Sequence, residues 1–325
     1  MERLYSVGLW LWGKLCDRFN VQGYRDFLAP SAAIKEARRI PKVSGVELTY
    51  PDNVNEENWR VMRDLLNETG LRVSSIYCNL SSDPKWQKGA FVSEEKVLND
   101  AIRQVQRTMD LAVEFATNQI TFSLLQDGWD YPFQVDYQRA YNIIVGALQK
   151  CCDYRHDVSI GIEYKPREPR VFCFLATAPL VLLLIQEVQR ENIGVVLDIG
   201  HALMAREGLG NVVALINRYS KLLHLHLNDN YGDWDDDLIV GTTHFLNILE
   251  FVFWLRKTNY SGWYGLDIFP FREDPVQAAT ASIEFLEACH NVIDRLGLEN
   301  IEQLIADGNV PQTIRRLIQT VFALK

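Results

Sequence analysis

Short apolar runs alternate with longer amphipathic segments along most of the chain. Eight runs have the length and the branched or aromatic content of strands, at residues 5–12, 45–49, 72–77, 119–124, 159–164, 194–198, 222–227 and 263–268. Apolar residues recur at helical spacing between and after them, at residues 32–39, 56–68, 93–115, 137–154, 178–190, 211–218, 245–257 and 275–295. Strict alternation of eight strands with eight helices predicts an α/β fold, the (β/α)8 or TIM barrel.

The predicted barrel occupies residues 1–295, and residues 296–325 form a C-terminal helical extension with helical patterns at 300–306 and 311–323. A doubly wound open sheet is the structural alternative. That fold usually carries a G-x-G-x-x-G turn after a strand, and no predicted strand is followed by one. The barrel also predicts where function lies, because its active sites form at the C-terminal ends of the strands.

Composition and charge narrow the class of protein. The chain has 325 residues, of which 48% are hydrophobic and 23% charged, as expected for a globular protein with a large core. A net charge of −9 argues against nucleic acid or an anionic membrane as partner, because both select clustered Lys and Arg. The six cysteines show no CxxC spacing, and the N-terminal residues lack a signal-peptide pattern. We therefore expect a cytoplasmic protein with reduced cysteines.

Metal-ligand residue types follow the last four predicted strands. The fifth strand ends with Glu163 and Lys165, the sixth with Asp198 and His201, the seventh with His226, and the eighth carries Asp267. Buried carboxylates without a partner are costly, and a divalent cation is a common way to neutralise several at once. For any single residue, a salt bridge or a helix cap is an alternative explanation.

An acidic loop follows the seventh strand. His224, His226 and Asn228 alternate along this segment, so their side chains share one face. The loop then carries Asp229, Asp233 and the run from Asp235 to Asp237. The alternative to a metal site here is a buried structural histidine pair beside a solvated acidic loop.

These residues, in this order, resemble the xylose isomerase-like barrel superfamily. The motifs are Glu163-x-Lys165-Pro166-x-Glu168-Pro169, Asp198-x-x-His201, His226-x-Asn228, Trp234-Asp235-x-Asp237 and Asp267, together with Ser6-Val7-Gly8-Leu9-Trp10 and Gln126-Asp127-Gly128-Trp129-Asp130-Tyr131-Pro132. The resemblance covers residues 5–275. No single motif is specific, but the ordered combination is.

The resemblance implies two metal ions per chain. The first ion would be held by Glu163, Asp198, His226 and Asp267, and the second by His201, Asp235 and Asp237, with Asp198 bridging both. Oxygen-rich ligation with one imidazole per ion suits Mn²⁺, Mg²⁺ or Co²⁺ better than zinc. Mn²⁺ is the first expectation.

The implied reaction interconverts an aldose and a ketose of a free sugar by a metal-assisted hydride shift. Lys165 would stabilise the developing oxyanion, with a salt bridge to Glu168 as the alternative role. Trp10, His201 and Trp129 would contact the sugar, although core packing is equally typical of such tryptophans.

The chain departs from xylose isomerases at two positions. Thr49 stands where they place a ring-opening histidine, and His226 replaces a carboxylate, as in rhamnose isomerase-like members and ketose epimerases. A ketose 3-epimerase, which would use Glu163 and Asp267 to move a proton, is therefore the main alternative. A keto-sugar lyase or dehydratase and a non-catalytic sugar-binding barrel are further ones. A DNA-repair endonuclease of the superfamily would need a basic groove. We also expect a homo-oligomer, either a dimer or a tetramer.

Overall fold

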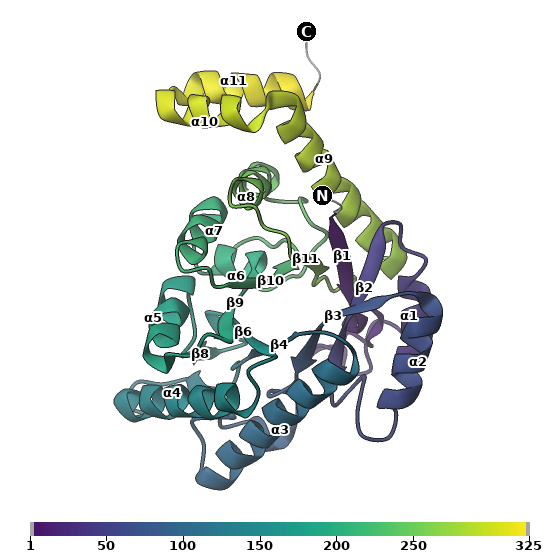
Figure 1. The fold of residues 1–325 in the computed structure, drawn as a ribbon, viewed down its shortest axis with the longest axis vertical. Helices are drawn as coiled ribbons and strands as arrows, with labels where there is room; N and C mark the ends of the chain where they lie inside the picture. The colour runs from purple at the N-terminus through teal and green to yellow at the C-terminus, as the bar shows by residue number, and fades with distance from the viewer. Residues whose placement is uncertain (1–2, 323–325) are drawn as a thin grey trace.

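Eight parallel strands close into a barrel in the computed structural model, which describes residues 3–322. Figure 1 looks into this barrel, with the helices arranged around it. The strand order around the barrel is β1-β11-β10-β9-β6-β4-β3-β2. The strands are β1 (Leu4–Gly8), β2 (Val43–Tyr50), β3 (Arg72–Cys78), β4 (Gln119–Ser123), β6 (Ser159–Glu163), β9 (Ile193–Asp198), β10 (Leu222–Leu227) and β11 (Trp263–Leu266). The predicted TIM barrel is confirmed.

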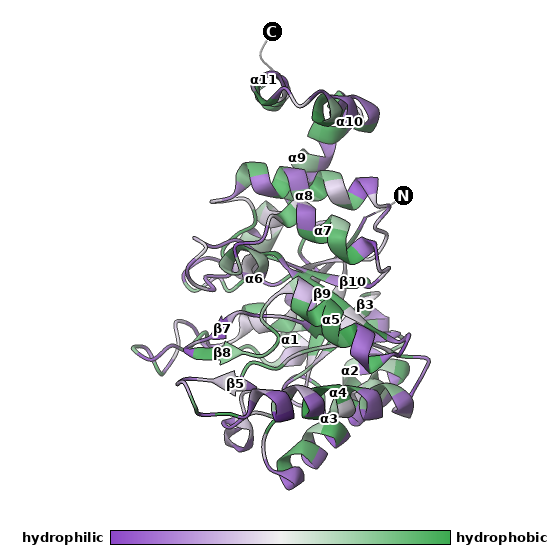
Figure 2. Ribbon diagram, turned by 90° about the vertical axis from the view of Figure 1, so that its left-hand side faces the viewer, coloured by the Kyte–Doolittle hydropathy of each residue, from purple (hydrophilic) through white to green (hydrophobic). Residues whose placement is uncertain are grey.

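The helices pack around the strands with their apolar faces inward, and hydrophilic residues colour their outer faces in Figure 2. The barrel helices are α1 (Pro30–Ala37), α2 (Trp59–Thr69), α3 (Glu95–Glu114), α4 (Tyr137–Tyr154), α5 (Ala178–Val188), α6 (Ile199–Met204), α7 (Leu209–Asn217), α8 (Phe245–Lys257) and α9 (Pro275–Leu296). Every residue of β9 is buried, which explains its uninterrupted apolar sequence before Asp198. Burial of each Leu, Ile or Phe side chain in this core contributes about 1.5–3 kcal/mol to folding.

The first strand is shorter than the sequence pattern predicts. It ends at Gly8, and Leu9–Trp12 form a 3-10 helix, η1, whose Leu9, Leu11 and Trp12 are buried. The indole of Trp10 folds back over Gly8, where an added Cβ would lie 2.0 Å from the ring. A strand would have sent Trp10 and Trp12 to one face; the tight turn instead brings Trp10 over the barrel mouth.

A small antiparallel sheet beside the barrel was not predicted. It pairs β5 (Gly128–Trp129) with β8 (Val171–Cys173), and β8 with β7 (Arg167–Glu168). This sheet ties the loop after β4 to the loop after β6. Because β7 begins only two residues after Lys165, the sheet helps to fix the segment that carries this lysine.

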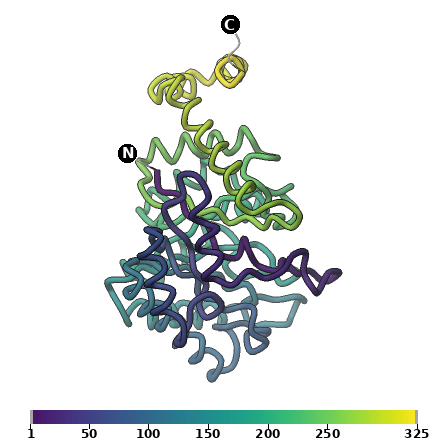
Figure 3. The backbone as a smooth tube through the Cα atoms, turned by 90° about the vertical axis from the view of Figure 1, so that its right-hand side faces the viewer, coloured from purple at the N-terminus to yellow at the C-terminus, as the bar shows by residue number. Residues whose placement is uncertain are grey.

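The C-terminal segment leaves the barrel after α9. Helices α10 (Leu298–Asp307) and α11 (Val310–Val321) project beyond the barrel in Figures 1 and 2, and α11 buries none of its residues. The loop between η1 and α1 also extends from the body, as the purple tube of Figure 3 shows. Among the described residues, no helix is long and apolar enough to cross a membrane.

Candidate active site

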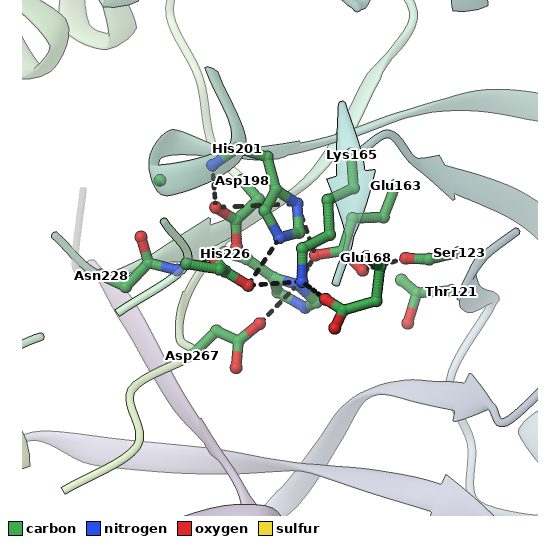
Figure 4. Close-up of polar contacts among 12 residues, drawn as sticks. Thr121, Ser123, Glu163, Lys165, Glu168, Asp198, His201, His226, Asn228 and Asp267 are labelled. Carbon is green, nitrogen blue, oxygen red and sulfur yellow. Dashed lines mark hydrogen bonds and ion pairs between the residues drawn. The ribbon is translucent and has the colours of Figure 1, made fainter. Parts of the chain in front are cut away.

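Four side chains from the last four barrel strands converge at the barrel mouth. Glu163 ends β6, Asp198 ends β9, His226 lies near the end of β10, and Asp267 directly follows β11. Each offers a ligand atom within 4.8 Å of the others. The parallel register explains this, since His226 pairs with Asp198 on one side and with Gly265 on the other. Figure 4 shows these side chains turned toward one another.

Hydrogen bonds hold the four groups in place. Asp198 caps α6 by accepting the backbone N–H of His201 at 2.8 Å. The hydroxyl of Ser123 donates to Glu163, whose other oxygen lies 2.8 Å from Nδ1 of His226. The indole Nε1 of Trp10 donates to Asp267 at 2.6 Å. The site is therefore ordered by its own neighbours.

This cluster has more negative charge than its surroundings balance. Burial raises the pKa of Asp198 to about 6 and that of Asp267 to about 8, and nearby carboxylates reinforce both shifts. Burial also opposes ionisation of Glu163, but the charge and hydrogen bond of His226 outweigh it and lower the Glu163 pKa to about 2. Within the four-residue cluster three carboxylates thus share the imidazole of His226, and Nδ1 of His201 lies 3.6 Å from Glu163 and 3.9 Å from Asp198.

The donor set suits a divalent cation. Three carboxylates and one imidazole match the oxygen-rich ligation with a single nitrogen that Mn²⁺, Mg²⁺ and Co²⁺ accept. Such a cation would neutralise carboxylates that burial otherwise keeps from ionising. The first predicted ligand set, Glu163, Asp198, His226 and Asp267, is accordingly brought together by the fold.

The second predicted ligand set is arranged less compactly. Nε2 of His201 lies 3.2 Å from Oδ2 of Asp235. The side-chain amide of Asn228 donates to Asp198 at 3.0 Å and to Asp237 at 2.9 Å, so it bridges these two carboxylates. Burial, reinforced by Asp235, raises the pKa of Asp237 well above its usual value. The residues are neighbours, but His201 and Asp235 pair with each other instead of facing a common point.

Lys165 is the cation of this region. Its ammonium lies 2.6 Å from Asp235 and also pairs with Glu168, and its side chain is 7% exposed. Burial disfavours the charged form, but Asp235 and Glu168 outweigh it and raise the Lys165 pKa well above its usual value. The salt bridge to Glu168, the alternative role for Lys165, is present, with Asp235 as a second partner. A pocket lined by Arg167, Glu168, Pro169, Met204, Asp233, Trp234 and Asp235 opens onto this ion cluster.

The two tryptophans predicted to contact substrate differ in position. The Trp10 ring lies edge-on to His226, at 6.1 Å between centroids, and so borders the four-residue cluster. The Trp129 ring stacks on Phe172 at 5.9 Å and tilts against Phe174, which places it in the aromatic packing of the small sheet. A sugar contact from Trp129 stays a prediction.

Sequence reasoning missed Glu47, the acidic residue on β2. Its carboxylate is buried and lies 2.9 Å from Nε2 of His224 and 3.1 Å from Nε2 of His226. The signal was present, since Glu47, between Val46 and Leu48, is the one charged residue of β2.

Comparisons with known proteins agree with this geometry. The family model described as xylose isomerase-like TIM barrel matches residues 34–289. A xylose isomerase from Thermus thermophilus is 28% identical over 296 residues, which cover 86% of this chain and 76% of that protein. The D-allulose 3-epimerase of Methylomonas sp. superposes with a TM-score of 0.70 at 18% identity, covering 88% of this chain and 97% of that one. An L-ribulose 3-epimerase superposes with a TM-score of 0.69 at 15% identity, covering 91% of this chain and 98% of that one. At these identities the two structural matches establish the fold.

Proposed function

Because the chain belongs to the xylose isomerase-like TIM barrel family, whose relatives include sugar isomerases and epimerases, we propose that it is a divalent-cation-dependent aldose–ketose isomerase acting on a free sugar. One observation carries this choice. A buried lysine ammonium, Lys165, lies beside Asp235 at the edge of a compact ligand set. A fixed cation at this place suits a reaction in which an oxyanion develops.

In the proposed reaction, hydrogen leaves C2 of the aldose with its electron pair and adds to C1. The C2 oxygen becomes a carbonyl, and the C1 oxygen becomes a hydroxyl by gaining the proton that O2 loses. A bound divalent cation supplies Lewis-acid polarisation of the carbonyl. Lys165 stabilises the negative charge that grows on O1, and the half-buried Trp10 gives the sugar an apolar wall beside His226.

Glu163, Asp198, His226 and Asp267 are proposed to hold the first ion, which we expect to be Mn²⁺. The second ion is proposed at His201, Asp235 and Asp237, with Asp198 bridging. For that ion to bind, Lys165 must release Asp235, to which it is paired at 2.6 Å. The incoming cation itself would provide that release, because it replaces the Lys165 ammonium as the charge partner of Asp235.

A ketose 3-epimerase is the second candidate, and it is supported by the engagement of Asp235, which is not free for a second cation while Lys165 holds it. If Lys165 keeps Asp235, only the first cation site operates, with Glu163 and Asp267 from opposite sides of that cluster available to move a proton. The two candidates differ in the fate of the migrating hydrogen. A hydride shift retains it, whereas proton transfer through carboxylates exchanges it with solvent.

The test is a screen of free aldoses and ketoses with Mn²⁺ in D₂O, followed by mass and NMR analysis of the product sugars. The proposal predicts an aldose–ketose pair with little solvent deuterium on carbon. Epimerisation at C3 with deuterium incorporated there would establish the second candidate. A metal-loaded, folded protein that converts no sugar in the screen, while its Lys165→Met variant behaves identically, would contradict both.

A further inference from the structure

Glu47 is a buried carboxylate of β2 whose polar partners lie on β4 and β10. It is 1% exposed, and its Oε1 accepts the Thr121 hydroxyl from β4 at 2.8 Å. Its Oε2 faces two imidazoles from β10, His224 at 2.9 Å and His226 at 3.1 Å. Every contact of this carboxylate thus comes from a buried side chain.

The two ring nitrogens of His226 face opposite partners. Nδ1 points to the ligand cluster, 2.8 Å from Glu163 and 3.3 Å from Asp267. Nε2 points to Glu47. A histidine that binds a cation must present a bare lone pair, and the proton on its other nitrogen needs an acceptor. For His226 the fold provides Nδ1 as the ligand atom and Glu47 as that acceptor.

We propose that Glu47 is a positioning residue of the metal centre, which holds His226 as the Nε2–H tautomer with Nδ1 aimed at the cation. This inference rests on the proposed function, because it takes His226 to be a ligand. A carboxylate behind a ligating imidazole also makes that imidazole a stronger donor. Glu47 touches neither sugar nor cation in this arrangement.

His224 completes the arrangement. Its Nδ1 is buried and finds no hydrogen-bond partner among residues 3–322, whereas its Nε2 faces Glu47. In the neutral Nε2–H tautomer of His224, the N–H donates to Glu47, and the unpartnered Nδ1 carries no proton. Glu47 then accepts two ring N–H groups and one hydroxyl, within the capacity of an ionised carboxylate.

A second cation among Glu47, His224 and His226 is the competing explanation, because their ligand atoms also lie within 4.8 Å of one another. That cation would take Nε2 of His226 while the first took Nδ1, so one imidazole would have to lose both protons. The two hydrogen bonds require no such step. The cluster is also fully buried, with no exposed ligand position for water or substrate.

The first test measures Mn²⁺ affinity of the metal-stripped full chain by calorimetry. Glu47→Gln should weaken Mn²⁺ binding about 10- to 100-fold, since the amide is a poorer acceptor for the His226 N–H. Asp127→Asn is the matched control: Asp127 is also buried, but it accepts three backbone N–H groups, from Ala90, Phe91 and Val92. The Mn²⁺ affinity of Asp127→Asn should stay within about threefold of the wild-type affinity.

The second test needs no change at Glu47. In Mg²⁺-loaded protein labelled with [¹⁵N]histidine, the ring signals of His226 are identified by their loss in His226→Asn. We expect a proton on Nε2 and none on Nδ1. A proton on Nδ1, or wild-type affinity in folded Glu47→Gln, overturns the role of Glu47 while leaving the proposed function standing. If wild-type protein binds no Mn²⁺, both fall together.

Discussion

Two buried histidines in different regions of the molecule have pKa values shifted in opposite directions. His226 at the barrel mouth is 1% exposed, and His290 in α9 is 2% exposed. Burial disfavours the charged form of both, but Glu47 and Glu163 outweigh it at His226 and raise its pKa well above the usual value. At His290, burial and the nearby Arg3 and Arg256 lower the pKa to about 4. Burial is common to both histidines, so the neighbouring charges account for the difference between the two pKa shifts.

The two histidines lie in different kinds of environment: charged groups surround His226 at the barrel mouth, whereas His290 is packed at the α9 face. The mouth collects carboxylates from three strands and an imidazole from a fourth, and this leaves the carboxylates with too few cations. At the α9 face, His290 packs 5.7 Å from the Tyr264 ring, and neither of its ring nitrogens has a hydrogen-bond partner among residues 3–322. Changes at the mouth should therefore affect chemistry, and changes at α9 should affect stability.

Removing one ligand carboxylate should have the largest effect. Asp198→Asn keeps an N-cap for α6, because asparagine also accepts the His201 N–H, but it loses a charged ligand. We expect catalysis to fall about 10³-fold or more, about 4 kcal/mol, in steady-state assays with Mn²⁺. Asp136→Asn is the control, because it makes the same change at the N-cap of α4, which lies outside the site. It should leave the rate unchanged. Equal losses in the two variants would show a folding effect instead.

Removing the cation at the mouth should come next. Lys165→Met keeps a side chain of similar length but cannot stabilise an oxyanion. We expect kcat to fall about 10²–10³-fold, with Mn²⁺ affinity retained. Lys221→Met is the control, because Lys221 precedes β10 at its other end, donates to backbone carbonyls of Arg190 and Glu191 and pairs with the exposed Glu191 carboxylate. An unchanged kcat in Lys165→Met would reduce Lys165 to a structural ion pair.

The packing region should respond to pH. Because the His290 pKa is about 4 in the folded protein and about 6.5 when unfolded, the unfolded chain binds more protons between these values. Stability should therefore fall as the pH drops from 6.5 toward 4. By pH 5 this histidine should account for about 2 kcal/mol of lost stability relative to pH 8. The free energy of unfolding in urea should be measured against pH for wild type and His290→Leu. The loss of about 2 kcal/mol should appear only in wild type. Identical pH profiles of the two proteins would contradict the role of His290.

The smallest effect should come from the edge of the site. Trp10→Phe keeps an aromatic wall but removes the indole N–H that Asp267 accepts at 2.6 Å. We expect kcat/KM to fall about tenfold, near 1.4 kcal/mol. Trp263→Phe, at the opposite end of β11, is the comparison and should be neutral for turnover. A larger loss in Trp263→Phe would mean that the barrel as a whole, not the contact, matters.

Most of the fold could be predicted from periodicity, because each barrel element buries one face. The strand at Leu222–Leu227 and the helices Tyr137–Tyr154 and Phe245–Lys257 have the predicted bounds. The end of β1 could not be predicted, since Leu9–Trp12 are as apolar as a strand, and the turn depends on Trp10 packing over Gly8. Strands as short as β5 and β7 leave no periodic signal.

The candidate site was partly predictable for a related reason. Glu163, Asp198, His226 and Asp267 each lie at a strand end, and parallel strands bring those ends together. Glu47 lies in the middle of a strand, and its partner His226 is on β10, across the barrel interior. The pairing of Lys165 with Asp235 likewise depends on side-chain packing between two loops. Neither contact is encoded in local spacing.

The most direct test of a metal centre at the barrel mouth is the number of Mn²⁺ ions retained by the protein after loading and gel filtration, measured by elemental analysis. We expect two ions per wild-type chain and a marked loss in Asp198→Asn, because Asp198 contributes to both proposed sites. If the wild-type chain retains one ion, Asp235 remains the partner of Lys165, and this result favours the epimerase. Folded wild-type protein that retains none would contradict the claim that the buried carboxylates at the mouth form a metal centre.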